Sequence, residues 1–145
     1  MKEKIAQINS NGSTHANFNL KIGSFNIHGQ GKTQLKLRKI KGLFTKGNFD
    51  ILLLQETRSD GGNNEFKRWK KIFNCKQIYL TSYGTRAVGA GIIVRSEDTF
   101  KILHHFEDPM GRYVGIIGDH EDGKFLVLSF YSPSAPYLEK SRNSS

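Results

Sequence analysis

Apolar and polar positions in the first half of the chain predict strands that alternate with helices. Residues 20–27 place apolar and polar side chains on alternate faces, which is typical of a strand. Over residues 34–46 apolar residues recur every three or four positions, which predicts a helix closed by Gly47. The continuous apolar run at 51–54 predicts a strand buried on both faces. This order describes a β-α-β unit, so the ends of its two strands should lie side by side.

A second helix is predicted from aromatic residues at helical spacing. Phe66, Trp69 and Phe73 recur every three or four residues, and Asn63 or Asn64 can cap the helix that they define. We interpret these aromatic side chains as core residues rather than as a platform for stacking bases.

From residue 77 onward the pattern changes to strands separated by turn residues. The polar run at 119–123 predicts a hairpin loop, whose acids form the turn rather than bind metal. His104 and His105 alternate within a strand and lack partners at zinc-site spacing, so we expect a structural role for them. Strands are expected near residues 77–82, 91–95, 100–106, 113–117 and 124–131.

Polar residues end the two strands of the β-α-β unit. Glu56 follows the buried run directly, where a carboxylate has no use in packing, and Asn26 lies near the end of the earlier strand. Position alone is equally compatible with a solvated charge that ends a strand. Because the carboxyl edge of such a sheet is where ligands bind, however, the pair could share one metal ion.

Five segments of the chain, taken in order, resemble the endonuclease/exonuclease/phosphatase superfamily. The likeness is to apurinic endonucleases and to the endonuclease domains of non-LTR retrotransposons. It implies an α/β fold that is the N-terminal half of a DNase I-like sandwich of two sheets, mixed but mostly antiparallel, with flanking helices. The segments are FNIHG at 25–29, the run from Asp50 to QET at 55–57, GAGIIV at 89–94, DPMGR at 108–112 and SFYSP at 129–133.

The resemblance implies a metal-dependent phosphodiesterase, usually with Mg²⁺ and with Mn²⁺ as a substitute. Glu56 matches the metal-binding Glu of the family, and Asn26 matches the Asn beside the metal site. Tyr131 matches the Tyr that approaches the scissile phosphate. Arg58, just beyond the metal Glu, and Arg112, in a Gly-Arg pair, match basic residues and are our candidates for substrate binding.

The chain also departs from the family pattern. His28 stands where many apurinic endonucleases have Asp, Met110 replaces the acid of a Glu-Gly-Arg motif, and Ser134 replaces an Asn. The sequence contains neither the family's Gly-Asp-x-Asn nor its final Ser-Asp-His. Because the missing water-activating group is worth about 10²–10⁴-fold, we expect the isolated chain to be inactive. If it did cleave, His28 or His120 would be the first candidates for the missing base.

Charge points to a polyanionic partner. The 145 residues carry a formal net charge of +9. Basic residues on a helix most often form a solvated face, but beside the phosphodiesterase motifs they favour nucleic acid, DNA above all, bound through salt-sensitive phosphate contacts. The two basic clusters are Lys32, Lys36, Arg38, Lys39 and Lys41, and Lys67, Arg68, Lys70 and Lys71.

Organisation and location are expected to be simple. We expect one partial domain over residues 20–137, between a disordered leader at 1–19 and a disordered tail at 138–145. No membrane span or secretory signal is evident, and Cys75 alone cannot form an internal disulfide, so an intracellular protein, nuclear or cytoplasmic, is expected. The oligomeric state stays open.

Three functions remain open from the sequence. The first is a truncated metal-dependent DNA endonuclease, the second a phosphodiesterase of the same superfamily acting on a lipid or inositol headgroup, and the third a non-catalytic nucleic-acid-binding module. If half of the sandwich is absent, one sheet loses its cover, and the chain should be marginally stable or prone to self-association. The sheet residues concerned include Ile51, Leu53, Ile92, Val94, Leu126, Val127 and Leu128.

Overall fold

The computed structural model describes residues 3–9, 19–29, 33–59, 62–75, 77–81, 88–121 and 123–132. The elements follow the predicted order of strands, helices and a final run of strands. They are β1 (Glu3–Asn9), β2 (Asn19–Asn26), α1 (Gln34–Lys46), β3 (Ile51–Gln55), α2 (Asn63–Phe73), β4 (Ile78–Leu80), β5 (Ala90–Val94), β6 (Lys101–Glu107), β7 (Tyr113–His120) and β8 (Gly123–Phe130).

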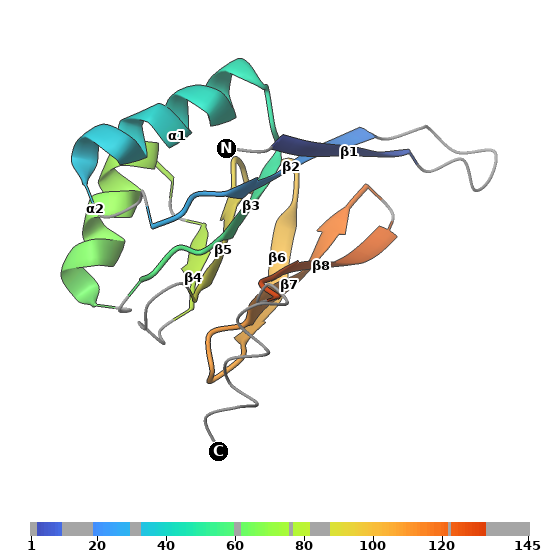
Figure 1. Ribbon diagram of the computed structural model, residues 1–145. Helices are drawn as coiled ribbons and strands as arrows, with labels where there is room; N and C mark the ends of the chain where they lie inside the picture. The colour runs from blue at the N-terminus through green and yellow to red at the C-terminus, as the bar shows by residue number, and fades with distance from the viewer. Residues whose placement is uncertain are drawn as a thin grey trace.

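These elements form three layers (Figure 1). Sheet A has the strand order β1-β2-β3-β5-β4, and sheet B has the order β6-β7-β8. Helices α1 and α2 cover one face of sheet A, and sheet B packs on the other face. Among the described strand pairs only β2 and β3 run parallel, so the sheets are mixed and mostly antiparallel, as expected.

Local interactions define where the two helices begin and end. The Thr33 side chain accepts a hydrogen bond from the Lys36 amide and caps α1. Gly47 follows the last residue of the helix, at a position where the Phe49 ring leaves no room for a Cβ. The prediction of an Asn cap for α2 is wrong. Gly62 holds the extended cap conformation, which places Asn63 and Asn64 inside the first turn.

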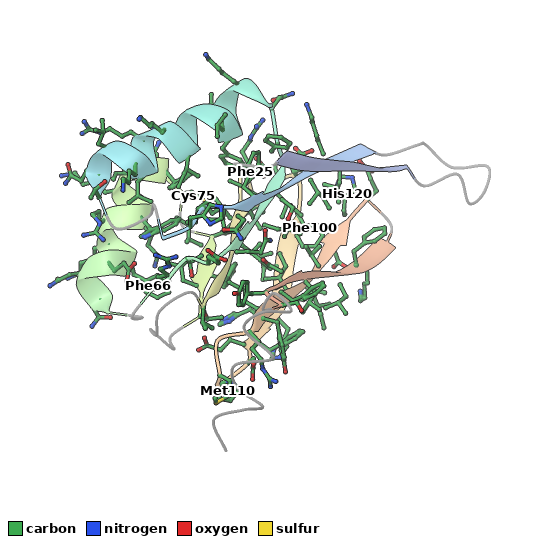
Figure 2. The ribbon with its side chains drawn as sticks, in the orientation of Figure 1. Phe25, Phe66, Cys75, Phe100, Met110 and His120 are labelled. Atoms are coloured by element: carbon green, nitrogen blue, oxygen red, sulfur yellow. The ribbon has the colours of Figure 1, made fainter. Side chains whose placement is uncertain are left out.

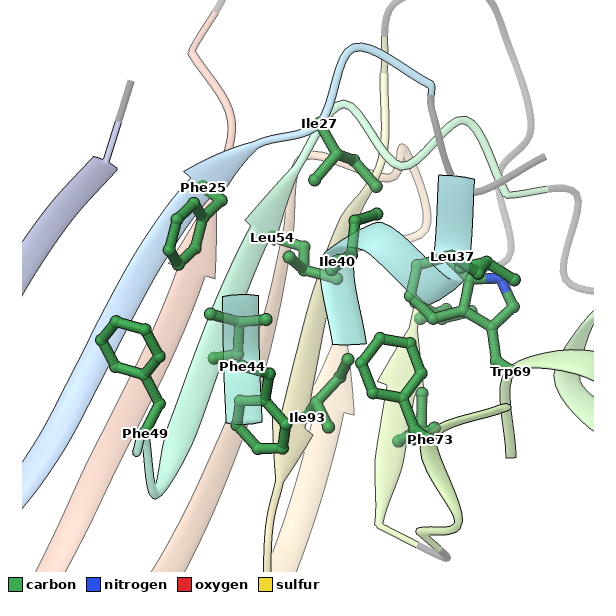
Figure 3. Close-up of a cluster of buried hydrophobic side chains, with 13 residues drawn as sticks. Phe25, Ile27, Leu37, Ile40, Phe44, Phe49, Leu54, Trp69, Phe73 and Ile93 are labelled. Atoms are coloured by element: carbon green, nitrogen blue, oxygen red, sulfur yellow. The ribbon is translucent and has the colours of Figure 1, made fainter. Parts of the chain in front are cut away.

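The first core lies between the helices and sheet A (Figure 3). Leu37, Ile40 and Phe44 of α1 meet Leu54 of β3, and Trp69 stacks on Phe73 at a centroid distance of 5.7 Å. Trp69 is fully buried, so its predicted role in packing is confirmed.

The second core joins the two sheets. Ile51 of β3 and Ile92 of β5 face Val114 and Ile116 of β7 across this layer, and Phe100, labelled in Figure 2, lies among them. The strand β3 is therefore buried on both faces, because even and odd residues enter different cores. This confirms the prediction made from the continuous apolar run at 51–54.

The outer face of sheet B has no cover among the described residues. Leu126 is 61% exposed, Leu128 40% and Phe130 60%. The prediction that a sheet lacks its cover therefore holds for Leu126 and Leu128, while Ile51, Ile92, Val94 and Val127 are buried.

Two further details differ from the sequence predictions. Residues Glu3–Asn9, expected in a disordered leader, form β1, because the open edge of β2 offers them an antiparallel partner. The hairpin loop is shorter than predicted, since pairing continues through Asp119 and His120. The tail at 138–145 lies outside the described residues. Neither of the described helices is both long and apolar enough to cross a membrane.

Candidate active site

The candidate site lies where the parallel strands β2 and β3 end. Asn26 is paired with Gln55 in the strand register, and the ladder continues beyond it, with the Ile27 amide donating to the Gln55 carbonyl at 3.0 Å and the Gly29 amide to the Glu56 carbonyl at 2.7 Å. The two strand ends therefore lie side by side, as the β-α-β pattern predicted.

The backbone after β3 turns sharply and is held in place. Glu56 and Arg58 both have a positive φ, near +52°, and the residue between them, Thr57, is buried. The Arg58 amide donates to the Val88 carbonyl at 3.0 Å, and the Thr57 amide donates to Gly89. Gly89 has a φ of +119°, and a Cβ there would lie 2.3 Å from the Thr57 hydroxyl, so only glycine fits. These hydrogen bonds hold the backbone that carries Glu56.

The Glu56 carboxylate has two basic neighbours. His28 Nδ1 lies 3.1 Å from Glu56 Oε2, and Arg58 Nη2 lies 3.7 Å from the same oxygen. The Glu56 side chain is only 14% exposed, whereas His28 and Arg58 are more open. The contact of His28 with Glu56 was not predicted, because the two residues are 28 positions apart and meet only through the strand register and the turn at His28.

Asn26 shapes the turn that presents His28. Its side-chain oxygen accepts a hydrogen bond from the His28 amide at 3.0 Å, which stabilises a turn in which His28 has a φ of +47°. One lone pair of the Asn26 side-chain oxygen is therefore occupied. Its second lone pair and the side-chain NH₂ group remain available to a ligand.

A cleft of about 530 Å³ opens at this edge between the two sheets. Asn26 and Glu56 line it from sheet A, and Tyr131, just beyond β8, lines it from sheet B. The Tyr131 amide donates to the Arg112 carbonyl at 2.7 Å, which anchors the backbone at this point. The structure thus brings the three predicted residues Asn26, Glu56 and Tyr131 to one cleft.

Polar side chains that line the cleft connect the two sheets. Gln55 Nε2 donates to Ser24 Oγ at 3.0 Å and lies 3.4 Å from Ser129 Oγ, while Ser129 Oγ donates to the Leu54 carbonyl at 2.8 Å. The sequence analysis did not assign these residues. The only signal was a polar position among apolar ones in β2 and β8.

Arg112 lies outside the group of residues that line the cleft. Its Nε donates to Asp108 Oδ2 at 2.6 Å, and Asp108 also accepts from the amides of Met110 and Arg112. The Arg112 hydrogen bond is the main reason that the pKa of Asp108 is below its ordinary value. Arg112 thus holds the turn before β7, and its contact with a substrate stays a prediction.

His120 lies away from the cleft. His120 ends β7 at the opposite end from Tyr113, which pairs with Phe130 beside the cleft. An eight-residue strand separates these ends by roughly 23 Å. Figure 2 shows Met110 and His120 at opposite ends of sheet B. His120 is therefore too far away to replace a base in this cleft, whereas His28 is near enough.

The ligand set fits a partly hydrated magnesium ion. No group of three or more His, Cys, Asp or Glu side chains that could hold a metal occurs among the residues that the structure describes. Glu56 and Asn26 nevertheless supply one carboxylate and one amide oxygen, and Mg²⁺ usually binds through one or two carboxylates while keeping several waters. A soft or four-coordinate metal would not be satisfied here.

Several solved structures have a fold similar to that of this chain. TDP2 from Caenorhabditis elegans matches 88% of this chain, with a TM-score of 0.62 and 20% sequence identity, and the match covers 39% of TDP2. A truncated form of TDP2 from the same organism matches 85% of this chain, with a TM-score of 0.60 and 20% identity, over 50% of that chain.

An AP endonuclease, LMAP from Leishmania major, matches 87% of this chain, with a TM-score of 0.56 and 16% identity, over 45% of its length. No protein-family model and no curated protein sequence matches the chain. The chain spans half or less of the length of these neighbours. Two packed sheets with helices outside are shared with these proteins, so the chain has the DNase I-like fold that the sequence predicts.

Proposed function

We propose that this chain is part of a metal-dependent phosphodiesterase that cleaves DNA, of the apurinic-endonuclease or retrotransposon-endonuclease type. One observation carries the proposal: Asn26, Glu56 and Tyr131, from three separate segments, line a single cleft at the carboxyl edge of sheet A. The fold neighbours support it, since one of them is an AP endonuclease. The net charge of +9 favours a polyanionic substrate.

Each residue has a distinct task in this proposal. Glu56, assisted by Asn26, would hold Mg²⁺, which when bound neutralises charge on the phosphoryl oxygens. Tyr131 approaches the phosphate from the side of sheet B with its hydroxyl as a donor. Arg58 forms an ion pair with the Glu56 carboxylate, which orients it, and adds positive charge near the phosphate. These groups bind and orient the phosphodiester, but none of them is placed to activate a water.

Metal binding tests the proposal without requiring turnover. We expect Mn²⁺, followed by isothermal titration calorimetry, to bind the 145-residue chain at one site. Glu56→Gln should weaken this binding by roughly tenfold or more, because the only carboxylate ligand is lost. Glu97→Gln is the matched control, since Glu97 is exposed in the turn before β6 and should leave binding unchanged. Equal Mn²⁺ affinity in the wild type and Glu56→Gln would refute the metal site.

Cleavage is a separate test of how complete the site is. The purified chain should not nick supercoiled plasmid in Mg²⁺ above background, because the described residues that line the cleft include no histidine and no carboxylate besides the metal-binding Glu56. Nicking that disappears in Glu56→Ala would show that the phosphodiesterase assignment is right but that the site is complete. His28→Ala would then identify the base, since His28 is the histidine that contacts Glu56.

A non-catalytic nucleic-acid-binding module is the second candidate. The observation in its favour is that the described residues include no cluster of three metal-binding side chains. Under this alternative DNA binding would be the same in EDTA and in Mg²⁺, and Glu56→Gln would not change it. The phosphodiesterase proposal requires that Mg²⁺ strengthen binding and that Glu56→Gln remove the increase.

A further inference from the structure

A basic groove lies between α1 and α2, on the face of sheet A opposite to sheet B (Figure 1). It has a volume of about 590 Å³, within the range of ligand pockets. We name it the helix groove. Its polar lining is cationic or neutral and contains no carboxylate. The cations that line it are Arg38, Lys41, Lys67, Arg68 and Lys71.

Helical spacing explains why these cations share one groove. Arg38 and Lys41 follow Gln34 at intervals of four and three along α1, and Lys67 and Lys71 follow Asn64 at intervals of three and four along α2. Residues at such intervals lie on one face of a helix. Each row therefore extends for about 10 Å, which is long enough to run beside more than one phosphate of a strand.

The positive charge of the groove has no internal counter-charge. Within the described part of the chain, the ion pairs are His28 and Arg58 with Glu56, Arg112 with Asp108, and Lys124 with Asp119, so none involves a cation of the groove. The single acid of α2, Glu65, is buried and accepts from Ser59 instead.

The side chain of Arg68 also indicates that the groove could bind an anion. Its Nε is buried and has no hydrogen-bond partner in the described structure. A buried donor without an acceptor is unfavourable, and a small rotation of the guanidinium onto a phosphate would satisfy it. None of the residues that line the groove is aromatic, and Phe66 of α2 faces the ammonium of Lys70 at 5.9 Å. The groove thus offers donors for phosphates but no surface for stacking bases.

From this geometry we propose that the helix groove binds the sugar-phosphate backbone of one nucleic-acid strand, without regard to its base sequence. Two rows of cations suit a chain of phosphates. The concave shape admits such a chain, whereas a flat membrane would touch the outward-facing residues of the helices instead.

The groove also begins at the edge of sheet A that carries Glu56. Both helices start after strands that end at this edge, so Gln34 and Asn64 mark the near end of the groove. A strand in the groove could continue toward the cleft. Only this last point rests on the proposed function, and binding in the groove requires no metal.

Salt dependence of binding tests the proposal. Fluorescence anisotropy of a labelled 20-nucleotide oligothymidine would be measured in EDTA at 50 to 200 mM KCl. The groove variant Arg38→Gln/Lys67→Gln/Lys71→Gln removes three exposed charges of the lining. We expect the slope of log K against log salt to become shallower by about 2, at about 0.7 per phosphate contact, and the affinity at 50 mM to fall roughly tenfold or more.

The control variant removes the same charge from the same helices outside the groove. Lys36→Gln/Lys39→Gln/Lys70→Gln changes exposed lysines that do not line it, and should alter the slope by less than about 0.7, or one contact. Equal losses in the two variants would show that net charge alone attracts the strand and would overturn the proposal. So would an unchanged slope in the groove variant, with melting curves confirming that both variants fold.

Two further arms separate alternative explanations. Vesicles containing phosphatidylserine should bind the groove variant and the control variant equally, and a selective loss for the groove variant with vesicles but not with oligothymidine would assign the groove to a membrane. Repeating the oligothymidine titration with Glu56→Ala should give wild-type affinity in EDTA. Failure of the metal site would thus leave the groove result unaffected, and failure of the groove would leave the metal titration unaffected.

Discussion

Sheets A and B are built from similar apolar residues, but the described residues cover sheet A on both faces and sheet B on one. Leu54 of β3 lies under the helices with no exposed surface, whereas Leu126 of β8 is 61% exposed on the outer face of sheet B. The same side chain is therefore a core residue in one sheet and a surface residue in the other. Burial, rather than hydrophobicity, decides what each contributes to stability.

The largest expected effect is on the stability of the sheet A core. Leu54→Ala should lower the free energy of unfolding by about 2–5 kcal/mol, because it opens a cavity in a fully buried layer. Leu126→Ala, the same change in sheet B, should stay within about 0.5 kcal/mol. Urea unfolding followed by Trp69 fluorescence measures both, and equal losses would contradict the one-sided cover of sheet B.

An intermediate loss of stability is expected where Ser129 of sheet B bonds to sheet A. Ser129→Ala removes the hydroxyl that donates to the Leu54 carbonyl at 2.8 Å and that meets Gln55. A buried acceptor without its donor costs about 1–3 kcal/mol, so Ser129→Ala should be destabilising by that amount. Ser96→Ala, which removes a solvent-exposed hydrogen bond from the Asp98 amide in the turn before β6, serves as the control in the same urea titration and should cost less. A neutral Ser129→Ala would mean that water replaces the bond.

The exposed face of sheet B should govern solubility rather than stability. Leu126→Ser with Phe130→Ser should reduce self-association, measured by light scattering, and should reduce the binding of the dye ANS, because both residues belong to one exposed apolar surface. The midpoint of urea unfolding should change little. If the double variant unfolds instead, this face is covered in solution by something that the described residues do not include.

A smaller, pH-dependent effect is expected at the turn before β7. The Arg112 hydrogen bond lowers the pKa of Asp108, so the carboxylate adds stability above its ordinary pKa of 3.8, and that stability is lost as the pH falls through the lower folded value. Wild type should exceed Asp108→Asn in stability at pH 5 to 8, and the gap should close in stronger acid. Asp98→Asn, in an exposed turn, should show no such gap. A gap that persists at pH 2 would assign the effect to geometry rather than charge.

The order of the elements could be predicted from the sequence because most of them carry their own periodicity. The helix α1 was predicted over its observed range, and the burial of β3 followed from its continuous apolar run. The cap of α2 was missed, since Gly62 offers no side chain to recognise. The strand β1 was also missed, because its partner, β2, rather than its own pattern makes it a strand.

The candidate site was predictable only where it depends on strand ends. Asn26 and Glu56 each end a strand, so parallel pairing was enough to bring them together. The approach of His28 to Glu56 depends on a turn with positive φ, which the sequence does not reveal. The helix groove is similar: nine basic residues formed two clusters in the sequence, but helical phase selects the five that converge.

The most direct test of the account is a map of where a paramagnetic metal binds. Mn²⁺ added in small amounts to ¹⁵N-labelled protein broadens the signals of nearby backbone amides. The account predicts that the amides of Asn26, Glu56 and Tyr131 broaden first, that excess Mg²⁺ reverses the effect, and that Glu56→Gln abolishes it. Broadening centred on the acids of the hairpin at 119–121, or broadening unchanged by Glu56→Gln, would contradict the claim that three separate segments form one metal-dependent phosphodiesterase site.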